Sequence, residues 1–173
     1  MTKSNLQKAF TTKSLIAYIT LGDPSLEFTE KLIKGSFEAG ADLIEIGIPF
    51  SDPVADGPVI QASHQRALAK DPEIGIEKGL EVVRRVKKEH DKPILFMVAA
   101  NIVYAYGIKN FFKDCSLSGL DSCIIPDLCI EDAEEYLKYS KFFKVGIVFL
   151  VSHLTKENRL KKIVKNSSPF VYL

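Results

Sequence analysis

The stretch from Leu15 to Gly47 reads LIAYITLGDPSLEFTEKLIKGSFEAGADLIEIG and shows the repeating pattern of the chain most clearly. Its first part, Leu15 to Thr20, is a β-rich apolar run that ends at a Leu-Gly-Asp-Pro breaker. Ser25 can then cap a helix over about Leu26 to Ala39, which carries apolar residues on one face. A second apolar run, Leu43 to Gly47, follows directly. The stretch therefore predicts a strand–helix–strand unit.

The same alternation continues along the rest of the sequence. Further strands are expected at Pro93–Val98, Asp121–Ile125, Val145–Val151 and Phe170–Leu173. Further helices are expected near Gln61–Ala69, Gly75–Glu89, Ile108–Ser118, Ile130–Phe143 and Lys156–Asn166. The helix at Ile130 has an acidic first turn that complements the helix dipole, formed by Glu131, Asp132, Glu134 and Glu135. Apolar strands separated by helices favour a parallel α/β sheet covered on both faces.

Two architectures fit this pattern, an open doubly wound sheet and a (β/α)8 barrel. The turn after the first strand, Leu21 to Pro24, offers one glycine and a proline rather than a glycine-rich phosphate loop. This weighs against a nucleotide-binding sheet. No linker or low-complexity tract divides the chain, so we expect a single domain over residues 1–173.

Composition excludes several classes of protein. With 46% hydrophobic and 26% charged residues and a net charge of +1, the chain is neither disordered nor collagen-like, and it has no electrostatic footprint for nucleic acid or an anionic membrane. No apolar run approaches the roughly 18 residues of a membrane span. The segment Met1–Lys8 lacks the apolar region of a secretory signal. Three cysteines without metal-ligand spacing suit a reducing cytosol, so we expect a cytoplasmic protein.

The most unusual segment is Leu43 to Gln61, LIEIGIPFSDPVADGPVIQ. Glu45 lies within an apolar strand, where burial raises the pKa of a carboxyl group toward the range useful for proton transfer. A structural glutamate paired with a lysine or capping the backbone is the alternative. Asp56 lies on the proline-rich loop after that strand, at the end where α/β folds bind ligands. Asp52 and Asp56 can also cap turns, and Asp127, just past the fourth strand, joins the rim of the candidate site.

Other polar residues carry weaker signals. The three histidines lie far apart and lack ligand spacing, so we expect no metal site; they are His64, His90 and His153. Cys123 and Cys129 flank the end of the fourth strand, and we interpret them as packing or loop residues rather than nucleophiles.

The segment from Glu45 to Gly57, EIGIPFSDPVADG, resembles the signature of the tryptophan synthase α subunit family. Supporting matches run along the whole chain; they are TLGDP (20–24), EAGAD (38–42), AN (100–101), PDL (126–128), FLV (149–151) and FVYL (170–173). The resemblance implies a (β/α)8 TIM barrel, of which residues 1–173 would form about six βα units. It also implies retro-aldol cleavage of indole-3-glycerol phosphate to indole and glyceraldehyde 3-phosphate. Indole would pass to a β subunit in an α2β2 complex. Pyridoxal phosphate would belong to that β subunit, and this chain would carry no cofactor.

The resemblance assigns roles to individual residues. Glu45 matches the catalytic acid/base at the indole ring carbon, and Asp56 matches the carboxylate that holds the indole N–H. Matches to apolar substrate-pocket positions are Tyr18, Met97, Ile124, Leu150 and Tyr172, all of which could equally be barrel packing. Matches to loops that face the β subunit are Pro49, Asp52 and Asn101, for which plain turn chemistry is the alternative.

The chain also departs from the family pattern. Ala99 stands where relatives often carry a tyrosine, and Cys129 and His153 stand where prolines are common. In the family the mobile loop follows strand six and the phosphate-binding loops follow strands seven and eight, which lie outside the 173 residues. The alternative function is therefore a non-catalytic partner that binds and activates the β subunit through the loop Pro49–Gly57.

Overall fold

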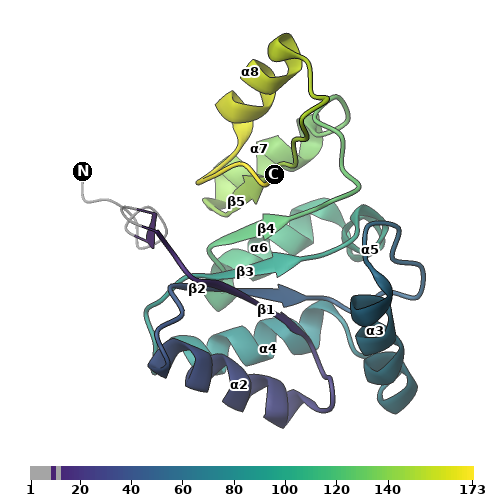
Figure 1. Ribbon diagram of the computed structural model, residues 1–173, viewed down its shortest axis with the longest axis vertical. Helices are drawn as coiled ribbons and strands as arrows, with labels where there is room; N and C mark the ends of the chain where they lie inside the picture. The colour runs from purple at the N-terminus through teal and green to yellow at the C-terminus, as the bar shows by residue number, and fades with distance from the viewer. Residues whose placement is uncertain (1–8, 11–12) are drawn as a thin grey trace.

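The computed structural model describes residues 9–10 and 13–173, and its centre is a five-stranded parallel sheet (Figure 1). The strands are β1 (Ile16–Thr20), β2 (Leu43–Gly47), β3 (Ile94–Met97), β4 (Ser122–Ile124) and β5 (Gly146–Val148). The helices are α2 (Leu26–Glu38), α3 (Pro58–Lys70), α4 (Ile76–Lys87), α5 (Ala100–Tyr106), α6 (Ile108–Ser118), α7 (Glu134–Phe143) and α8 (Glu157–Asn166). The segment Met1–Lys8, considered above for a signal sequence, lies outside the described residues.

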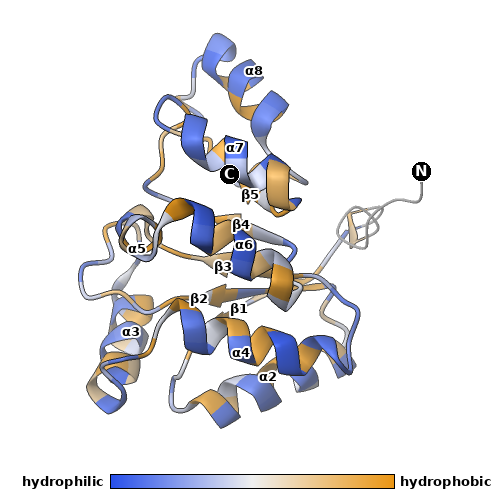
Figure 2. Cartoon of the chain, turned by 180° about the vertical axis from the view of Figure 1, so that it is seen from behind, coloured by the Kyte–Doolittle hydropathy of each residue, from blue (hydrophilic) through white to orange (hydrophobic). Residues whose placement is uncertain are grey.

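The order of the strands in space decides between the two predicted architectures. It is β1-β2-β3-β4-β5, the same as the order in sequence, and every pair is parallel. A doubly wound sheet reverses its strand order at a switch point, which places helices on both faces. Here each right-handed crossover leads in the same direction, so α2, α4 and α6 cover one face of the sheet (Figure 2). The arrangement is part of a (β/α)8 barrel, as predicted.

Alternation of side chains along the strands divides the core in two. Ile44, Ile46 and Phe96 point to the outer face and pack in the large cluster beneath the helices. The intervening positions form a smaller inner cluster, composed of Leu43, Leu95, Ile124 and Val148. In a barrel this inner side is the packed interior. Glu45 belongs to the same inner set because it lies between Leu43 and Gly47 on β2.

The predicted sixth strand is present only as one parallel bridge, between Leu150 and Tyr172. The Val151 N–H donates to the Tyr172 carbonyl at 2.8 Å, and the Tyr172 N–H donates to the Phe149 carbonyl at 3.0 Å. The described residues therefore form five βα units and the beginning of pairing for a sixth strand. The fifth strand ends at Val148 rather than at Val151 as predicted.

Two helices begin three or more residues away from the predicted position and one helix was not predicted, each for a local or tertiary reason. Helix α3 begins at Pro58, a residue suited to the first helical position, rather than at Gln61. Helix α7 begins only at Glu134, because backbone bonds from Leu128 and Asp132 first form turns, so Glu131 and Asp132 precede the helix. Helix α5 was not predicted. A carboxylate distant in sequence, that of Asp127, accepts a hydrogen bond from its first N–H at 2.8 Å.

Within the part of the chain that the structure describes, none of the helices combines the length and apolar character needed to cross a membrane.

Phe96 provides a test of the outer core. Its ring is fully buried between the sheet and helix α4, so Phe96→Ala should lower the free energy of unfolding by about 3–5 kcal/mol. Phe142→Ala is the matched control, because that ring is 76% exposed and its loss should change stability by about 0.5 kcal/mol or less. Denaturant titration measures both values. Equal losses for the two variants would contradict this assignment of the core.

Candidate active site

A cavity lies at the carboxyl ends of the strands, the end at which TIM barrels bind their substrates. Its walls come from four consecutive strands and the loops that follow them. Tyr18 on β1 and the loop after β2 form one side, and the segments that follow β3 and β4 form the other. The lining residues used below are Tyr18, Asp56, His64, Met97, Ala99 and Asp127.

Glu45 lies at the centre of β2, in register with Tyr18 of β1 and Leu95 of β3. The residue is only 3% exposed, and its Oε1 has no hydrogen-bond partner among the described residues. Burial raises the pKa of the carboxyl group to about 7, because the charged form loses its water without gaining a cation or donor in exchange. The alternative considered from the sequence, a structural glutamate that pairs with a lysine or caps the backbone, is therefore wrong. Glu45 is a buried acid with one free oxygen.

Asp56 is carried by the loop between β2 and α3. The backbone carbonyl of Asp56 accepts a hydrogen bond from Gln61 Nε2 at 2.7 Å, which ties the end of the loop to the first turns of α3. Its carboxylate lines the cavity, with Oδ2 at 4.0 Å from His64 Nδ1. The start of α3 therefore helps to hold the end of the loop that carries Asp56.

Tyr18 connects the two carboxylates. It lines the cavity that contains Asp56 and also a second hollow on the inner face, which it shares with Glu45 and Tyr172. Burial raises the pKa of its hydroxyl to about 12, and the negative charges of Asp56 and Glu45 add to this effect. Its ring passes over Gly47, where any Cβ would collide with the hydroxyl. Glu45 and Asp56 thus face different hollows that meet at Tyr18.

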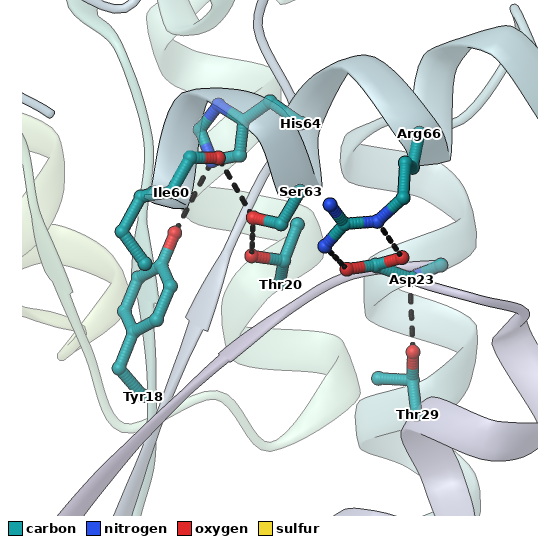
Figure 3. A network of polar contacts seen from close by, with 9 residues as sticks. Tyr18, Thr20, Asp23, Thr29, Ile60, Ser63, His64 and Arg66 are labelled. Carbon is teal, nitrogen blue, oxygen red and sulfur yellow. Dashed lines mark hydrogen bonds and ion pairs between the residues drawn. The ribbon is translucent and has the colours of Figure 1, made fainter. Parts of the chain in front are cut away.

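Helix α3 is attached to β1 by polar contacts, which Figure 3 shows. The Tyr18 hydroxyl lies 3.2 Å from His64 Nε2, and Thr20 Oγ1 lies 2.7 Å from Ser63 Oγ. Arg66 forms a bidentate ion pair with Asp23, at 2.6 and 3.0 Å. These bonds fix the rotation of α3 about its axis, and hence the direction in which His64 points.

His64 is the residue that sequence reasoning missed. The sequence presented it as one of three scattered histidines, yet it is 4% exposed and its Nδ1 has no hydrogen-bond partner among the described residues. Burial lowers the pKa of the imidazole, while the Asp56 carboxylate and the Phe50 backbone act in the opposite direction. No local sequence signal indicates this role, because the ring meets Tyr18 only after α3 has packed on β1.

The predicted pocket residues separate into groups. Tyr18 and Met97 line the cavity, and Tyr172 lines the hollow beside Glu45. Ile124 is fully buried in the inner cluster, and Leu150 packs against that cluster and pairs with Tyr172. Substrate contact by these five residues stays a prediction.

The predicted interface residues differ in exposure. Asp52 is exposed on the loop after β2, where it accepts a hydrogen bond from the Ser51 hydroxyl, and Asn101 is exposed in the first turn of α5. Pro49 is buried and leaves little surface for a partner. Binding of a partner subunit through these residues stays a prediction. The exposed side chains of Asp52 and Asn101 fit this role better than the buried Pro49.

The remaining candidates fall outside the chemistry of the cavity. Asp127 is on its rim, where it caps α5, and Ala99 lines its wall. Cys123 is buried in the outer core, where burial raises the pKa of its thiol, and Cys129 and His153 are exposed. No group of three or more potential metal ligands was found among residues 9–10 and 13–173.

Comparison with known proteins agrees with this geometry. The family model for the tryptophan synthase alpha chain matches residues 5–173. A tryptophan synthase alpha chain from Caldanaerobacter subterraneus is 45% identical over 160 residues, which cover 92% of this chain and 60% of the relative. One from Alkaliphilus metalliredigens is 41% identical over 165 residues, covering 95% and 61%. The chain thus spans about three fifths of the length of these curated relatives.

Solved structures give the same result. Tryptophan synthase subunit alpha from Legionella pneumophila superposes with a TM-score of 0.89 at 34% identity, covering 97% of this chain and 66% of that one. A chain of the tryptophan synthase complex from Pyrococcus furiosus superposes with a TM-score of 0.87 at 36% identity, covering 92% and 65%. Because the match extends from residue 5 to residue 173 and carries both fold and motif, the chain belongs to the tryptophan synthase alpha chain family.

Proposed function

We propose that this chain carries the two catalytic carboxylates of an indole-3-glycerol-phosphate lyase in tryptophan biosynthesis. The observation that supports this most directly is Glu45, a buried carboxyl group with one unpartnered oxygen on the inner face of the barrel. An acid at this position, with its pKa raised to about 7, can both donate and accept a proton near neutral pH.

The reaction breaks the carbon–carbon bond between the indole ring and the glycerol phosphate side chain. In the proposed mechanism, Glu45 delivers a proton to the ring carbon that carries the side chain. The hydroxyl group on the adjacent side-chain carbon loses its proton, and that side-chain carbon becomes the aldehyde of glyceraldehyde 3-phosphate. The electron pair of the broken carbon–carbon bond returns to the indole ring. One proton is added and one is lost, so a single carboxyl group that cycles between its two forms balances the reaction.

Asp56 has the complementary role in this proposal. Protonation of the ring carbon places positive charge on the indole nitrogen, and a fixed carboxylate that accepts the N–H hydrogen bond stabilises that charge. Tyr18 and Met97 would form apolar walls around the ring because they line the same cavity. Ile124, Leu150 and Tyr172 would contribute from the inner cluster and its edge.

The proposal includes a β subunit as partner. The solved structures similar to this chain include the α2β2 complex of Pyrococcus furiosus. We expect a corresponding complex to form through Asp52 and Asn101, which are exposed beside the cavity, with a smaller contribution from Pro49. Pyridoxal phosphate would be bound by the β subunit, and the α chain would act without a cofactor, in the cytoplasm.

Substitution of the carboxylates tests the reaction. In the full-length protein that carries these residues, Glu45→Gln should lower kcat for indole release about 10²–10⁴-fold, because the amide cannot transfer the proton. Asp56→Asn should lower kcat roughly 10²-fold through loss of charge stabilisation. Glu131→Gln is the control, since that carboxylate is exposed and pairs with Arg159.

The results of these assays distinguish the lyase from the non-catalytic partner of the β subunit. Indole release that survives Glu45→Gln would contradict the role of Glu45 as the catalytic acid/base, and a full-length wild type that releases no indole would contradict the lyase function. Stimulation of β-subunit activity by a wild-type protein that releases no indole would favour the non-catalytic partner instead.

The pH dependence of stability tests the buried acid itself. The pKa of Glu45 is higher in the fold than in the unfolded chain, so the folded state binds more protons between about pH 4.5 and 7, and stability falls as pH rises through that window. Glu45→Gln should therefore match the wild type near pH 4.5 and exceed it at pH 8, by up to about 3 kcal/mol. Denaturant titrations at several pH values measure the difference.

The matched control for this experiment has the opposite sign. Arg159 lowers the pKa of Glu131, so Glu131→Gln should be less stable than the wild type at pH 8, with the difference shrinking in acid. A Glu45→Gln variant without a stability gain at pH 8 would show that the Glu45 carboxylate is solvated or paired in the fold.

A further inference from the structure

His64 lies between the two polar groups that wall the cavity. Its Nε2 is 3.2 Å from the Tyr18 hydroxyl, and its Nδ1 is 4.0 Å from Asp56 Oδ2. The ring is 4% exposed and Nδ1 has no hydrogen-bond partner among the described residues, so Nε2 is within hydrogen-bond distance of Tyr18 while Nδ1 lies just beyond that distance from Asp56 Oδ2. Hydrogen bonds in active sites are often long without substrate and shorten in the complex.

The position of the proton on the ring follows from the neighbours of each nitrogen. A neutral imidazole carries one N–H and one acceptor nitrogen. If Nε2 carried the proton, the lone pair of Nδ1 would face the Asp56 carboxylate, so that two acceptors would oppose each other in a buried site. If the Tyr18 hydroxyl donates to Nε2, the proton resides on Nδ1 and points toward Asp56. Electrostatics therefore favours the Nδ1–H form.

The donor is held rigidly, whereas the acceptor is on a loop. Helix α3 is anchored on either side of His64, to β1 by the Thr20–Ser63 hydrogen bond and to the turn after β1 by the Asp23–Arg66 ion pair (Figure 3). Asp56 precedes this helix on the loop that follows β2. A small movement of the loop toward the cavity would bring the carboxylate onto Nδ1–H without displacing the ring.

We propose that His64 is a positioning residue for Asp56, with its Nδ1–H donating to one carboxylate oxygen when substrate is bound and Tyr18 holding the ring in that tautomer. The inference rests on the proposed function and deepens it. One oxygen of Asp56 is then occupied by a protein donor, and the other is left for the substrate ring N–H. Tyr18 acts at a distance from the reacting atoms, through the imidazole, in addition to lining the cavity.

Two amide substitutions of His64 test the roles of the two ring nitrogens separately. An asparagine amide occupies the place of Nδ1 and can still donate to Asp56, whereas a glutamine amide reaches the place of Nε2 and meets Tyr18 instead. In the full-length protein with its β subunit, His64→Asn should keep kcat/KM for indole release within about threefold of the wild type. His64→Gln should lower it about ten- to hundredfold, the range for a hydrogen bond to a charged group, with the loss mainly in kcat.

Ser63→Ala is the control for a purely structural effect of loosening α3. Ser63 is adjacent to His64 and contacts β1 through Thr20, but it does not line the cavity. The Asp23–Arg66 ion pair still holds the helix in this variant, so the substitution should lower thermal stability and leave kcat/KM within about twofold. Loss of kcat in Ser63→Ala equal to that in His64→Gln would overturn the specific role of His64.

The tautomer provides a readout that does not depend on activity. Imidazole ¹⁵N chemical shifts of His64 in the full-length protein should show a protonated Nδ1 in the wild type and loss of that preference in Tyr18→Phe. A wild-type protein that releases no indole would overturn the proposed function, and with it this role. An active wild type with Nε2 protonated, or with His64→Asn and His64→Gln equally impaired, would overturn this inference alone.

Discussion

Strand β2 buries both of its faces, and the consecutive strand order gives these two faces different partners. One face packs against the helices and the other against the barrel interior, so side chains alternate between two environments along every strand. On β2 this alternation sends Ile44 and Ile46 to the helices and Glu45 to the interior. The candidate chemistry depends on this constraint, because it removes a carboxyl group from water while leaving it beside the inner hollow that it shares with Tyr18.

The interior position accounts for the electrostatics of the site. A carboxyl group without a cation or donor is more stable in its protonated form, and burial therefore raises the pKa of Glu45 to about 7. Such a group lowers the stability of the fold at neutral pH, and a stability cost of this kind is typical of functional sites. Tyr18, its neighbour in register on β1, feels the same burial and the charges of both carboxylates, so its hydroxyl keeps its proton and can serve as a donor.

Helix α3 connects the strand that carries Tyr18 to the loop that bears Asp56. It contacts β1 and the turn that follows β1 through polar side chains, those of Ser63, His64 and Arg66. Polar contacts of this type specify one orientation of the helix more narrowly than apolar packing alone, because each requires a particular direction. Asp56 is next to the first turn of this helix, so the orientation of α3 and the position of the loop carboxylate are coupled.

Much of the fold could be predicted from local sequence, since β2 and α6 were placed at their observed bounds and both carboxylates were identified on a strand and its following loop. Periodicity and a carboxylate within an apolar strand are local properties, and they were sufficient to predict most of the strands and helices and the burial of Glu45. Periodicity left both the barrel and the doubly wound sheet open, and the strand order of the tertiary structure distinguished them. The tertiary structure also forms α5, whose cap is the distant Asp127. It also brought His64 to Tyr18, 46 residues away in sequence. These features depend on contacts between distant segments, which exist only after the strands have paired in order.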